Sequence, residues 1–211
     1  MGIILPSAYL APVSYYALLL AHGGELHIEQ WEHYVKQTVR NRAVIATEAG
    51  RMSLTIPVEH NGGRKIAMRD VRISEHGNWQ HLHWQALRAA YEGSPYFEFY
   101  CDDLAVFYHD KPSKYLLDFS LKLQQTVCNL ISLPWQPQLT DAYQREGDFI
   151  DLRNAFNAPA VGGKPYWQVF QSRHGFLPDL SIVDLLFNMG PEALLVLHDY
   201  PKDSFLAKSD C

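Results

Sequence analysis

The stretch from Ile3 to Glu29, IILPSAYLAPVSYYALLLAHGGELHIE, decides the fold of this chain. Its first residues, Ile3 to Leu5, form the short apolar run that is typical of a buried strand. Pro12 stands where proline favours the first turn of a helix, which we expect over Val13 to Leu20. A second short strand, Leu26 to Glu29, follows. Strand, helix and strand in this order predict a parallel pair with a right-handed crossover.

The loop after the first predicted strand, Pro6 to Ala11, carries a functional expectation. It lies at the carboxyl edge of the expected parallel sheet, which is where α/β proteins usually bind ligands. This loop should therefore border any ligand site.

The middle of the chain has the pattern of strands. A hairpin is expected from Ala43–Thr47 and Met52–Val58, because a turn at Ala49-Gly50 separates the two runs. Ile66 to Ile73 alternates approximately and predicts one more strand. The polar, glycine- and proline-punctuated stretch from about 140 to 165 predicts a long loop.

Helical periodicity dominates the remainder. It predicts helices from Asn78 onward, from Ser94-Pro95 to about Tyr108, over Lys114–Ile131, over Ser181–Met189 and from Pro191 to Leu197. The expected fold is therefore α/β: a strand-helix-strand unit with a mixed sheet, then a mainly helical C-terminal half. No internal repeat or break in composition divides the chain, so residues 1–211 are expected to form a single domain.

Composition excludes several classes of protein. The 211 residues are 47% hydrophobic, 13% aromatic and 19% charged, which argues against disorder, collagen and coiled coils. Residues 1–21 carry no charge, but Pro6 and Pro12 interrupt them and no basic segment precedes them, so neither a signal peptide nor a membrane span is expected. Three cysteines without a CxxC pair fit a reducing cytoplasm, and Cys128 in an apolar-periodic stretch predicts a buried structural thiol.

The charge is distributed unevenly. Eighteen basic and 23 acidic residues give a net charge of −5. The window from Lys36 to Arg72 nevertheless holds eight basic and three acidic residues, hence +5. An acidic body argues against non-specific binding of nucleic acid, and the window contains no aromatic residue that could stack on bases. The window favours instead the capture of one small phosphorylated ligand.

The segment Lys36-Gln37-Thr38-Val39-Arg40-Asn41-Arg42 packs three cations into seven residues beside amide donors. Guanidinium groups give bidentate hydrogen bonds to phosphate or carboxylate, and an ammonium adds charge. We therefore name as candidate phosphate ligands Lys36, Arg40, Asn41, Arg42, Arg64 and Lys65. The alternative is a solvated basic turn with scattered ion pairs.

Three histidines, His76, His81 and His83, are spaced H-x4-H-x-H. A metal site is not expected, because His81 and His83 would point to different sides of a helix and no carboxylate or cysteine completes the set. His81 is the candidate general base; the alternative is a structural histidine with satisfied hydrogen bonds.

Other motifs add little chemistry. Asn61-Gly62-Gly63-Arg64-Lys65 lacks the Walker spacing, and no G-x-G-x-x-G, G-x-S-x-G or H-E-x-x-H motif is present. No cofactor is therefore named. The segment from Arg173 to Ser181 is interpreted as a capped helix entrance. Asp184 and Asn188 lie four residues apart on one helix face; placement on the helix surface is the simpler account, and the alternative is that they reach a polar site.

In this order the segments resemble the WbqC-like protein family over most of the chain. The resemblance is carried by Pro6-Ser7-Ala8-Tyr9-Leu10-Ala11-Pro12 with Tyr15-Tyr16, Lys36 to Arg42, Leu54 to Val58, Trp79 to His81, Tyr91-x-x-Ser94-Pro95-Tyr96-Phe97 and Ser181 to Gly190. The family is associated with surface polysaccharide, especially O-antigen, and with modification of amino sugars. The resemblance thus implies a cytoplasmic, bacterial transferase that acts on a nucleotide-activated sugar.

On this hypothesis the basic residues hold the phosphates, and His81 activates a sugar amine or hydroxyl for acyl or aminoacyl transfer. Tyr9 and Tyr15 would line the sugar pocket at the edge of the first strand. The rival hypothesis is a non-catalytic anion-binding or scaffold protein of an envelope-polysaccharide pathway. The aromatic content is compatible with a homodimer.

Overall fold

The centre of the fold is a small parallel sheet. The computed structural model describes residues 2–60, 62–145, 147–160 and 163–201. Within them, β1 (Gly2–Pro6) pairs in parallel with β2 (Leu26–Glu29) on one side and with β6 (Phe149–Asp151) on the other. A fourth strand, β5 (Gln138–Leu139), pairs in parallel with β2. The strand order is therefore β5-β2-β1-β6, with β1 and β2 at the centre.

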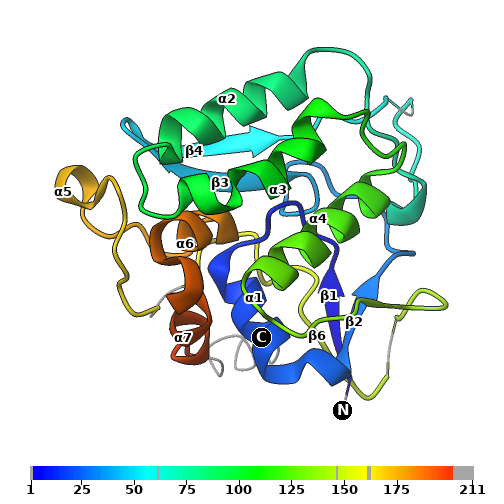
Figure 1. The fold of residues 1–211 in the computed structure, drawn as a ribbon. Coiled ribbons are helices and arrows are strands. Elements are labelled where there is room, and N and C mark those ends of the chain that lie inside the picture. Colours follow the sequence, from blue (N-terminus) through cyan, green and yellow to red (C-terminus); the bar gives the residue numbers. More distant parts are fainter. Residues whose placement is uncertain (1, 61, 146, 161–162, 202–211) are drawn as a thin grey trace.

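The predicted strand-helix-strand unit is confirmed. Helix α1 (Val13–His22) connects β1 to β2, and seven of its residues are buried, from Val13 to Leu19. Such all-round burial is what an uncharged, almost wholly apolar helix requires. The chain passes from β1 through α1 to β2 on one side of β1, and later from β5 to β6 on the other side, so the carboxyl edge between β1 and β6 is the topological switch point of the sheet (Figure 1).

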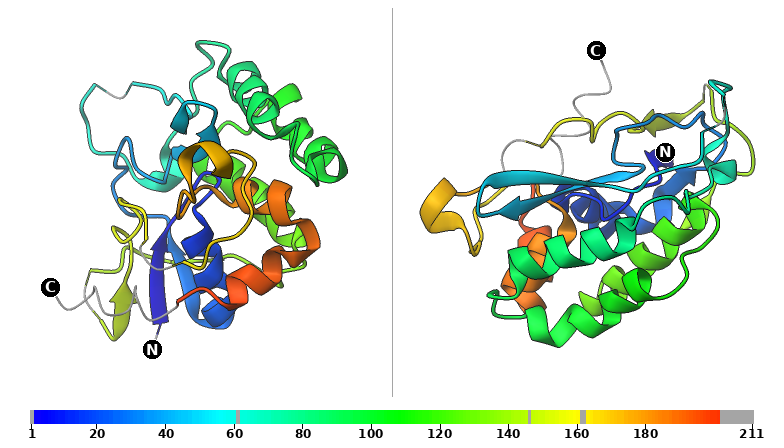
Figure 2. Two further views of the ribbon diagram at one scale, coloured as in Figure 1. Left: turned by 90° about the vertical axis from the view of Figure 1, so that its left-hand side faces the viewer. Right: turned by 90° about the horizontal axis from the view of Figure 1, so that it is seen from above.

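A separate antiparallel hairpin lies beside this sheet. It consists of β3 (Arg42–Thr47) and β4 (Gly50–Thr55), with Arg42 opposite Thr55 and Thr47 opposite Gly50. Parallel and antiparallel pairs both occur, as expected, but in two different sheets. Helix α2 (Trp79–Tyr91) runs along the hairpin, and the hydroxyl of Tyr91 accepts a hydrogen bond from the backbone N–H of Ala46 at 3.2 Å (Figure 2).

The C-terminal half is mainly helical, as predicted. It contains α3 (Phe97–His109), α4 (Leu116–Leu130), α5 (Gln171–His174), α6 (Ile182–Met189) and α7 (Ala193–His198). Ser181 caps α6 by accepting a hydrogen bond from the N–H of Val183, which confirms the predicted helix entrance. Helix α3 begins at Phe97, two residues later than Ser94-Pro95 would suggest, because residues 94–97 form a turn in which Phe97 N–H bonds to the Ser94 carbonyl.

Two sequence-based expectations were wrong. The predicted long loop of residues 140–165 contains β6, which completes the sheet beside β1. The predicted strand over Ile66–Ile73 is instead a 3₁₀ helix, Met68–Asp70, flanked by isolated bridges from Ala67 to His33 and from Ile73 to Val58. Both segments pair with distant residues, which local periodicity does not reveal.

The remaining findings concern two cysteines and the length of the helices. Cys128 is fully buried, as expected, and burial raises the pKa of its thiol to about 12. Cys211 lies outside the described residues. Among the helices of the described ranges, none has the length and apolar character needed to cross a bilayer.

Candidate functional site

A groove of about 680 Å³ brings together three of the predicted phosphate ligands. Lys36 lines one wall, and Arg64 and Lys65 line another, together with Arg72. All four side chains are exposed. The volume lies within the roughly 300–1,000 Å³ of typical ligand sites. Four cations face two acidic residues, Glu59 and Asp70, so the groove favours an anion.

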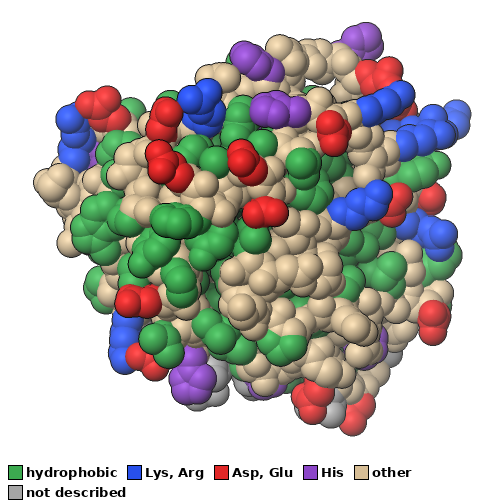
Figure 3. Space-filling view, in the orientation of Figure 1, with side chains coloured by type: hydrophobic (Ala, Val, Ile, Leu, Met, Phe, Trp, Pro, Cys, Tyr) green, Lys and Arg blue, Asp and Glu red, His purple; other side chains and the backbone are tan. Residues whose placement is uncertain are grey.

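Backbone pairing explains why residues so far apart in sequence meet there. The N–H of Tyr34 donates to the carbonyl of Ile66 at 2.9 Å, and the N–H of Met68 donates to the backbone carbonyl of Glu32 at 2.8 Å. These bonds set the segment before Lys36 beside the segment that follows Arg64-Lys65. Figure 3 shows Lys and Arg side chains gathered at the upper right edge of the molecule, over the loops that follow β4.

Two histidines also line the groove, His33 and His60. His60 accepts a hydrogen bond from the N–H of Gly62 through Nδ1, at 2.9 Å, so its neutral ring carries the proton on Nε2. Tyr34 completes this wall. Burial raises the pKa of the Tyr34 phenol to about 12, so the hydroxyl is protonated at neutral pH.

The segment Lys36–Arg42 forms a turn that is held by side-chain hydrogen bonds. Two of the residues predicted to bind phosphate, Arg40 and Asn41, make these bonds. Arg40 is 1% exposed, and its Nε and Nη2 donate to the two carboxylate oxygens of Glu32 at 2.7 and 2.6 Å. Asn41 is buried as well: its Nδ2 donates to the carbonyl of Ile56, and its Oδ1 accepts from the N–H of Gln37. Neither side chain faces the groove, because both are used by the protein itself.

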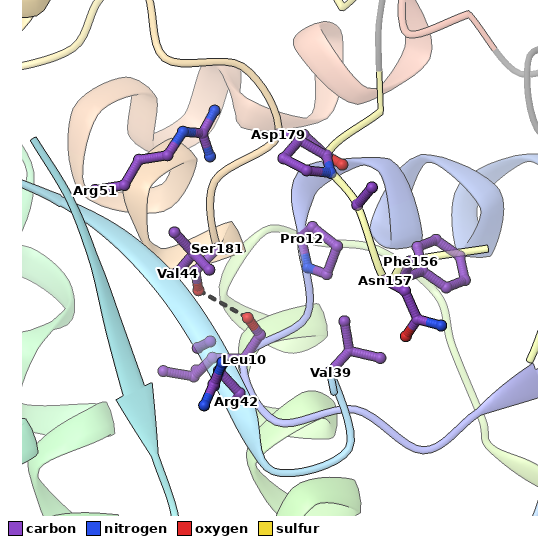
Figure 4. A pocket seen from close by; sticks show the side chains of 13 residues that line it. Leu10, Pro12, Val39, Arg42, Val44, Arg51, Phe156, Asn157, Asp179 and Ser181 are labelled. Atoms are coloured by element: carbon purple, nitrogen blue, oxygen red, sulfur yellow. Dashed lines mark hydrogen bonds between the residues drawn. The ribbon is translucent and has the colours of Figure 1, made fainter. Parts of the chain in front are cut away.

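Arg42 does not line the groove but faces a much smaller cavity of about 90 Å³, called the small cavity below (Figure 4). Leu10 and Pro12 contribute from the loop after β1, and Val39 and Arg42 from the basic turn. The loop at the carboxyl edge and the Lys36–Arg42 segment thus share this cavity, whereas no residue of Pro6–Ala11 lines the groove. Its volume is too small for a nucleotide sugar, since ligand pockets usually exceed about 300 Å³.

Three charged side chains that line the small cavity, Arg42, Arg51 and Asp179, make hydrogen bonds to other groups of the protein. Arg42 donates from Nε to the hydroxyl of Thr55 at 3.2 Å, and Arg51 donates to the carbonyl of Pro178. Asp179 accepts from the backbone N–H groups of Ser14 and Ala160, at 2.9 and 2.6 Å, and so caps α1. Burial raises the pKa of the Asp179 carboxyl, against the effect of these hydrogen bonds.

Comparison with known proteins agrees with the order of the segments. The model of the WbqC-like protein family matches residues 7–159. The chain belongs to this family. An uncharacterized protein of Mycobacterium tuberculosis, Rv1507c, is 26% identical to this WbqC-like protein over 223 residues, which cover 90% of the chain and 94% of the relative. No solved structure matches.

The structure of this WbqC-like protein places Tyr9 and Tyr15 in the core, although the sequence suggested a sugar pocket. Both are fully buried. The Tyr9 hydroxyl bonds to Nδ1 of His83 at 2.9 Å and to the hydroxyl of Tyr108 at 2.8 Å. The Tyr15 hydroxyl donates to the carbonyl of Pro6. Neither residue belongs to the lining of the groove or of the small cavity.

The histidines of α2 divide between surface and core. His81, the candidate base, is exposed and belongs to neither lining. His83 is buried, and burial lowers its pKa to about 4, with a backbone hydrogen bond to Thr55 acting in the opposite direction. His83 is therefore a structural histidine of the core, hydrogen-bonded to Tyr9. Within the described ranges, no three histidine, cysteine or acidic side chains are grouped so that they could hold a metal ion.

Sequence reasoning missed a network of ion pairs at the carboxyl edge of the sheet. Glu29, fully buried at the end of β2, accepts hydrogen bonds from Trp31, Thr140 and Gln144. Arg153 makes a bidentate pair with Asp151 at the end of β6. Burial works against ionisation of Asp151, but the bonds from Arg153 outweigh it and hold the pKa of the carboxyl below its ordinary value. Charged groups from the protein thus occupy the edge where a ligand was expected.

The simpler expectation for Asp184 and Asn188, placement on a helix surface, was wrong. Both are buried in α6, not exposed on its surface. The Asp184 carboxylate accepts hydrogen bonds from Tyr91, Tyr166 and Gln168, at 3.0, 2.6 and 2.8 Å. Burial raises the pKa of Asp184 to about 6.

Proposed function

We propose that this WbqC-like protein is a cytoplasmic bacterial transferase that modifies a nucleotide-activated amino sugar for surface polysaccharide, such as O-antigen, by acyl or aminoacyl transfer. One observation carries the proposal: Lys36, Arg64 and Lys65, from two separate segments, line a single groove of ligand size. A diphosphate supplies the charge that such a cluster favours, and charge-assisted hydrogen bonds to it are the strongest that lysine and arginine make.

In this proposal the diphosphate is bound by the residues that line the groove, and not by all basic residues of the Lys36–Arg42 turn. Lys36, Arg64, Lys65 and Arg72 hold the diphosphate in this proposal. Arg40 and Asn41 support the turn that presents Lys36, because their side chains bond to Glu32 and Ile56. Arg42 lies at the small cavity, on the other side of the same turn.

The base that removes a proton from the sugar nucleophile is assigned by position. His81 was the candidate from the sequence, and it stays one as an exposed residue of α2. His33 has the stronger claim in the structure, because it lines the groove itself. We therefore propose that replacing His33 by Gln lowers transfer more than replacing His81 by Gln does.

The C-terminal residues beyond the family match belong to the same unit in this proposal. A bridge joins Pro12 to Ser181, and the N–H of Val13 bonds to the carbonyl of Leu180 at 3.0 Å. These contacts favour one domain over residues 1–211. A homodimer is also part of the proposal, and exposed Leu82, Phe99 and Val106 on α2 and α3 offer apolar surface for it.

The test is thermal stabilisation by a panel of nucleotide sugars, with the change in melting temperature as the readout. We expect stabilisation of the native protein by at least one member. The triple variant Lys36→Ala, Arg64→Ala, Lys65→Ala should lose it, whereas Lys164→Ala with Arg88→Ala, which removes exposed cations elsewhere, should keep it. A panel without any shift, or an unchanged shift in the triple variant, overturns the proposal.

The rival function is a non-catalytic anion-binding or scaffold protein of an envelope-polysaccharide pathway. The observation that favours it is the closed carboxyl edge, where protein side chains occupy the usual ligand position of the fold. Mass spectrometry of the bound sugar after incubation with acyl and aminoacyl donors separates the two. A mass increase supports the transferase; binding without conversion by any donor supports the rival.

A further inference from the structure

A second cavity adjoins the groove and shares two of its residues. It has a volume of about 590 Å³ and lies around the start of α2. Arg72 and Glu59 line both this cavity and the groove. The two backbones are paired, since the N–H of Glu59 donates to the carbonyl of Arg72 at 3.0 Å. The two cavities therefore meet at these residues.

The arrangement of the backbone explains the junction. The segment that carries Arg72 lies between two neighbours: Ile73 forms a bridge with Val58 on one side, and Arg72 forms one with Tyr115 on the other. The N–H of Ile73 also bonds to the carbonyl of Lys114 at 3.0 Å. Residues 57–59, 71–74 and 114–116 thus form a three-segment wall, and this wall brings Lys114 to the second cavity.

The second cavity has its own donors for an anion. Lys111 and Lys114 line it beside Arg72. Lys122 reaches its rim, where Nζ lies 3.5 Å from the hydroxyl of Ser113. Ser74, which is 8% exposed, also lines the cavity; its Oγ accepts from the N–H of His76, and no described residue accepts its hydroxyl hydrogen. Two carboxylates, Glu59 and Glu75, also line the cavity, so its three cations outnumber its acidic groups by one.

The start of α2 adds to this set. Its first-turn residues Trp79 and Gln80 line the cavity, and the N-cap residue Asn78 makes no side-chain capping bond. Uncapped N–H groups at a helix start favour a negative group. They support the cations here and do not define the site alone.

We propose that this second cavity binds a phosphate group of a co-substrate, next to the nucleotide sugar in the groove. The proposal rests on the function proposed above, because it names the second ligand of the same transferase. Phosphate is favoured over carboxylate because its three acceptor oxygens can accept hydrogen bonds from Arg72, Lys111 and Lys114 together, whereas a carboxylate offers two oxygens. Arg72 contacts both ligands, and the negative charge of Glu59 repels both.

The test counts binding sites for inorganic pyrophosphate by equilibrium dialysis. The native protein should bind two equivalents. Lys111→Ala with Lys114→Ala should remove the site in the second cavity and leave the groove, whereas Lys36→Ala with Arg64→Ala should do the reverse. Arg72→Ala should weaken both sites about tenfold or more, which is the loss of one charge-assisted contact. Glu59→Gln should strengthen both, and Arg88→Ala should change neither.

The outcomes separate the inference from the function on which it rests. One equivalent, lost in Lys36→Ala with Arg64→Ala and unchanged in Lys111→Ala with Lys114→Ala, overturns the second site and leaves the groove. One equivalent with the opposite pattern removes the groove and supports the second site. Absence of binding overturns the second site, while the nucleotide-sugar panel judges the groove independently. Circular dichroism of each variant excludes unfolding as the cause of a loss.

Discussion

The guanidinium of Arg40 and the carboxylate of Glu32 form a bidentate ion pair inside the protein, with side-chain exposures of 1% and 8%. This pair lies beneath the turn that presents Lys36 to the groove. A group chosen from the sequence as a phosphate ligand is thus a structural cation. Burial raises the pKa of Glu32, and the hydrogen bonds from Arg40 act against that rise and favour the carboxylate.

Breaking this pair should be costly. Arg40→Ala leaves the Glu32 carboxyl buried without a partner, so we expect a loss of about 3–5 kcal/mol in the free energy of unfolding. The double variant Arg40→Met, Glu32→Gln removes both charges and should regain most of the loss. Urea unfolding at pH 7 measures both. An Arg40→Ala variant of native stability would mean that the pair does not exist in solution.

Asp184 should make the protein more stable as the pH falls from about 7 to 4. Its pKa is raised to about 6 from 3.8, so the folded state takes up a proton before the unfolded state does. The stabilisation is complete below 3.8 and is lost as the pH rises through 6, and it amounts to about 3 kcal/mol. Subtracting the unfolding curve of Asp184→Asn from that of the native protein should show this slope. A flat difference contradicts it.

His83 should act in the opposite direction over the same range. Its pKa is lowered to about 4 from 6.5, so the folded state resists protonation. The stability that depends on neutral His83 is complete above 6.5 and is lost as the pH falls through 4, by about 3 kcal/mol. His83→Gln should therefore lose less stability than the native protein between pH 6.5 and 4. His81→Gln is the control, since that ring is exposed.

Gly190 should not accept a side chain. It ends α6 with φ of +52°, and an added Cβ would lie 2.5 Å from the ring of Tyr96. Gly190→Ala combines a left-handed backbone with a clash, so we expect a loss of more than about 1 kcal/mol in thermal unfolding. Gly24→Ala is the matched control, because its Cβ would have no neighbour within 4 Å. Equal melting temperatures would contradict the described turn.

The sequence predicted the N-terminal unit well because its signals are local. An apolar strand, a proline before the helix and the strand Leu26–Glu29 require no knowledge of distant residues, and β1, α1 and β2 match them. The short strand β6 was missed since it has three residues, and only its pairing with β1 identifies it as a strand. Pairing between distant segments leaves little trace in local periodicity.

The candidate site was predictable in composition but not in assignment. The basic window does supply the groove, yet charge alone could not tell Lys36, which lines the groove, from Arg40, which is buried on Glu32. Glu25, Glu29 and Glu32 all precede the basic turn in the sequence, and only the fold shows that Glu32 is the one that pairs with Arg40. Likewise, spacing on α2 marked His81 and His83 without revealing which ring meets Tyr9.

A crystal structure of the protein with the nucleotide sugar that stabilises it most shows directly where the diphosphate binds. We expect electron density for the diphosphate in the groove, within hydrogen-bond distance of Lys36 and of Arg64 or Lys65. A diphosphate bound elsewhere, for example beside Arg42 at the small cavity, with the groove empty, would contradict it.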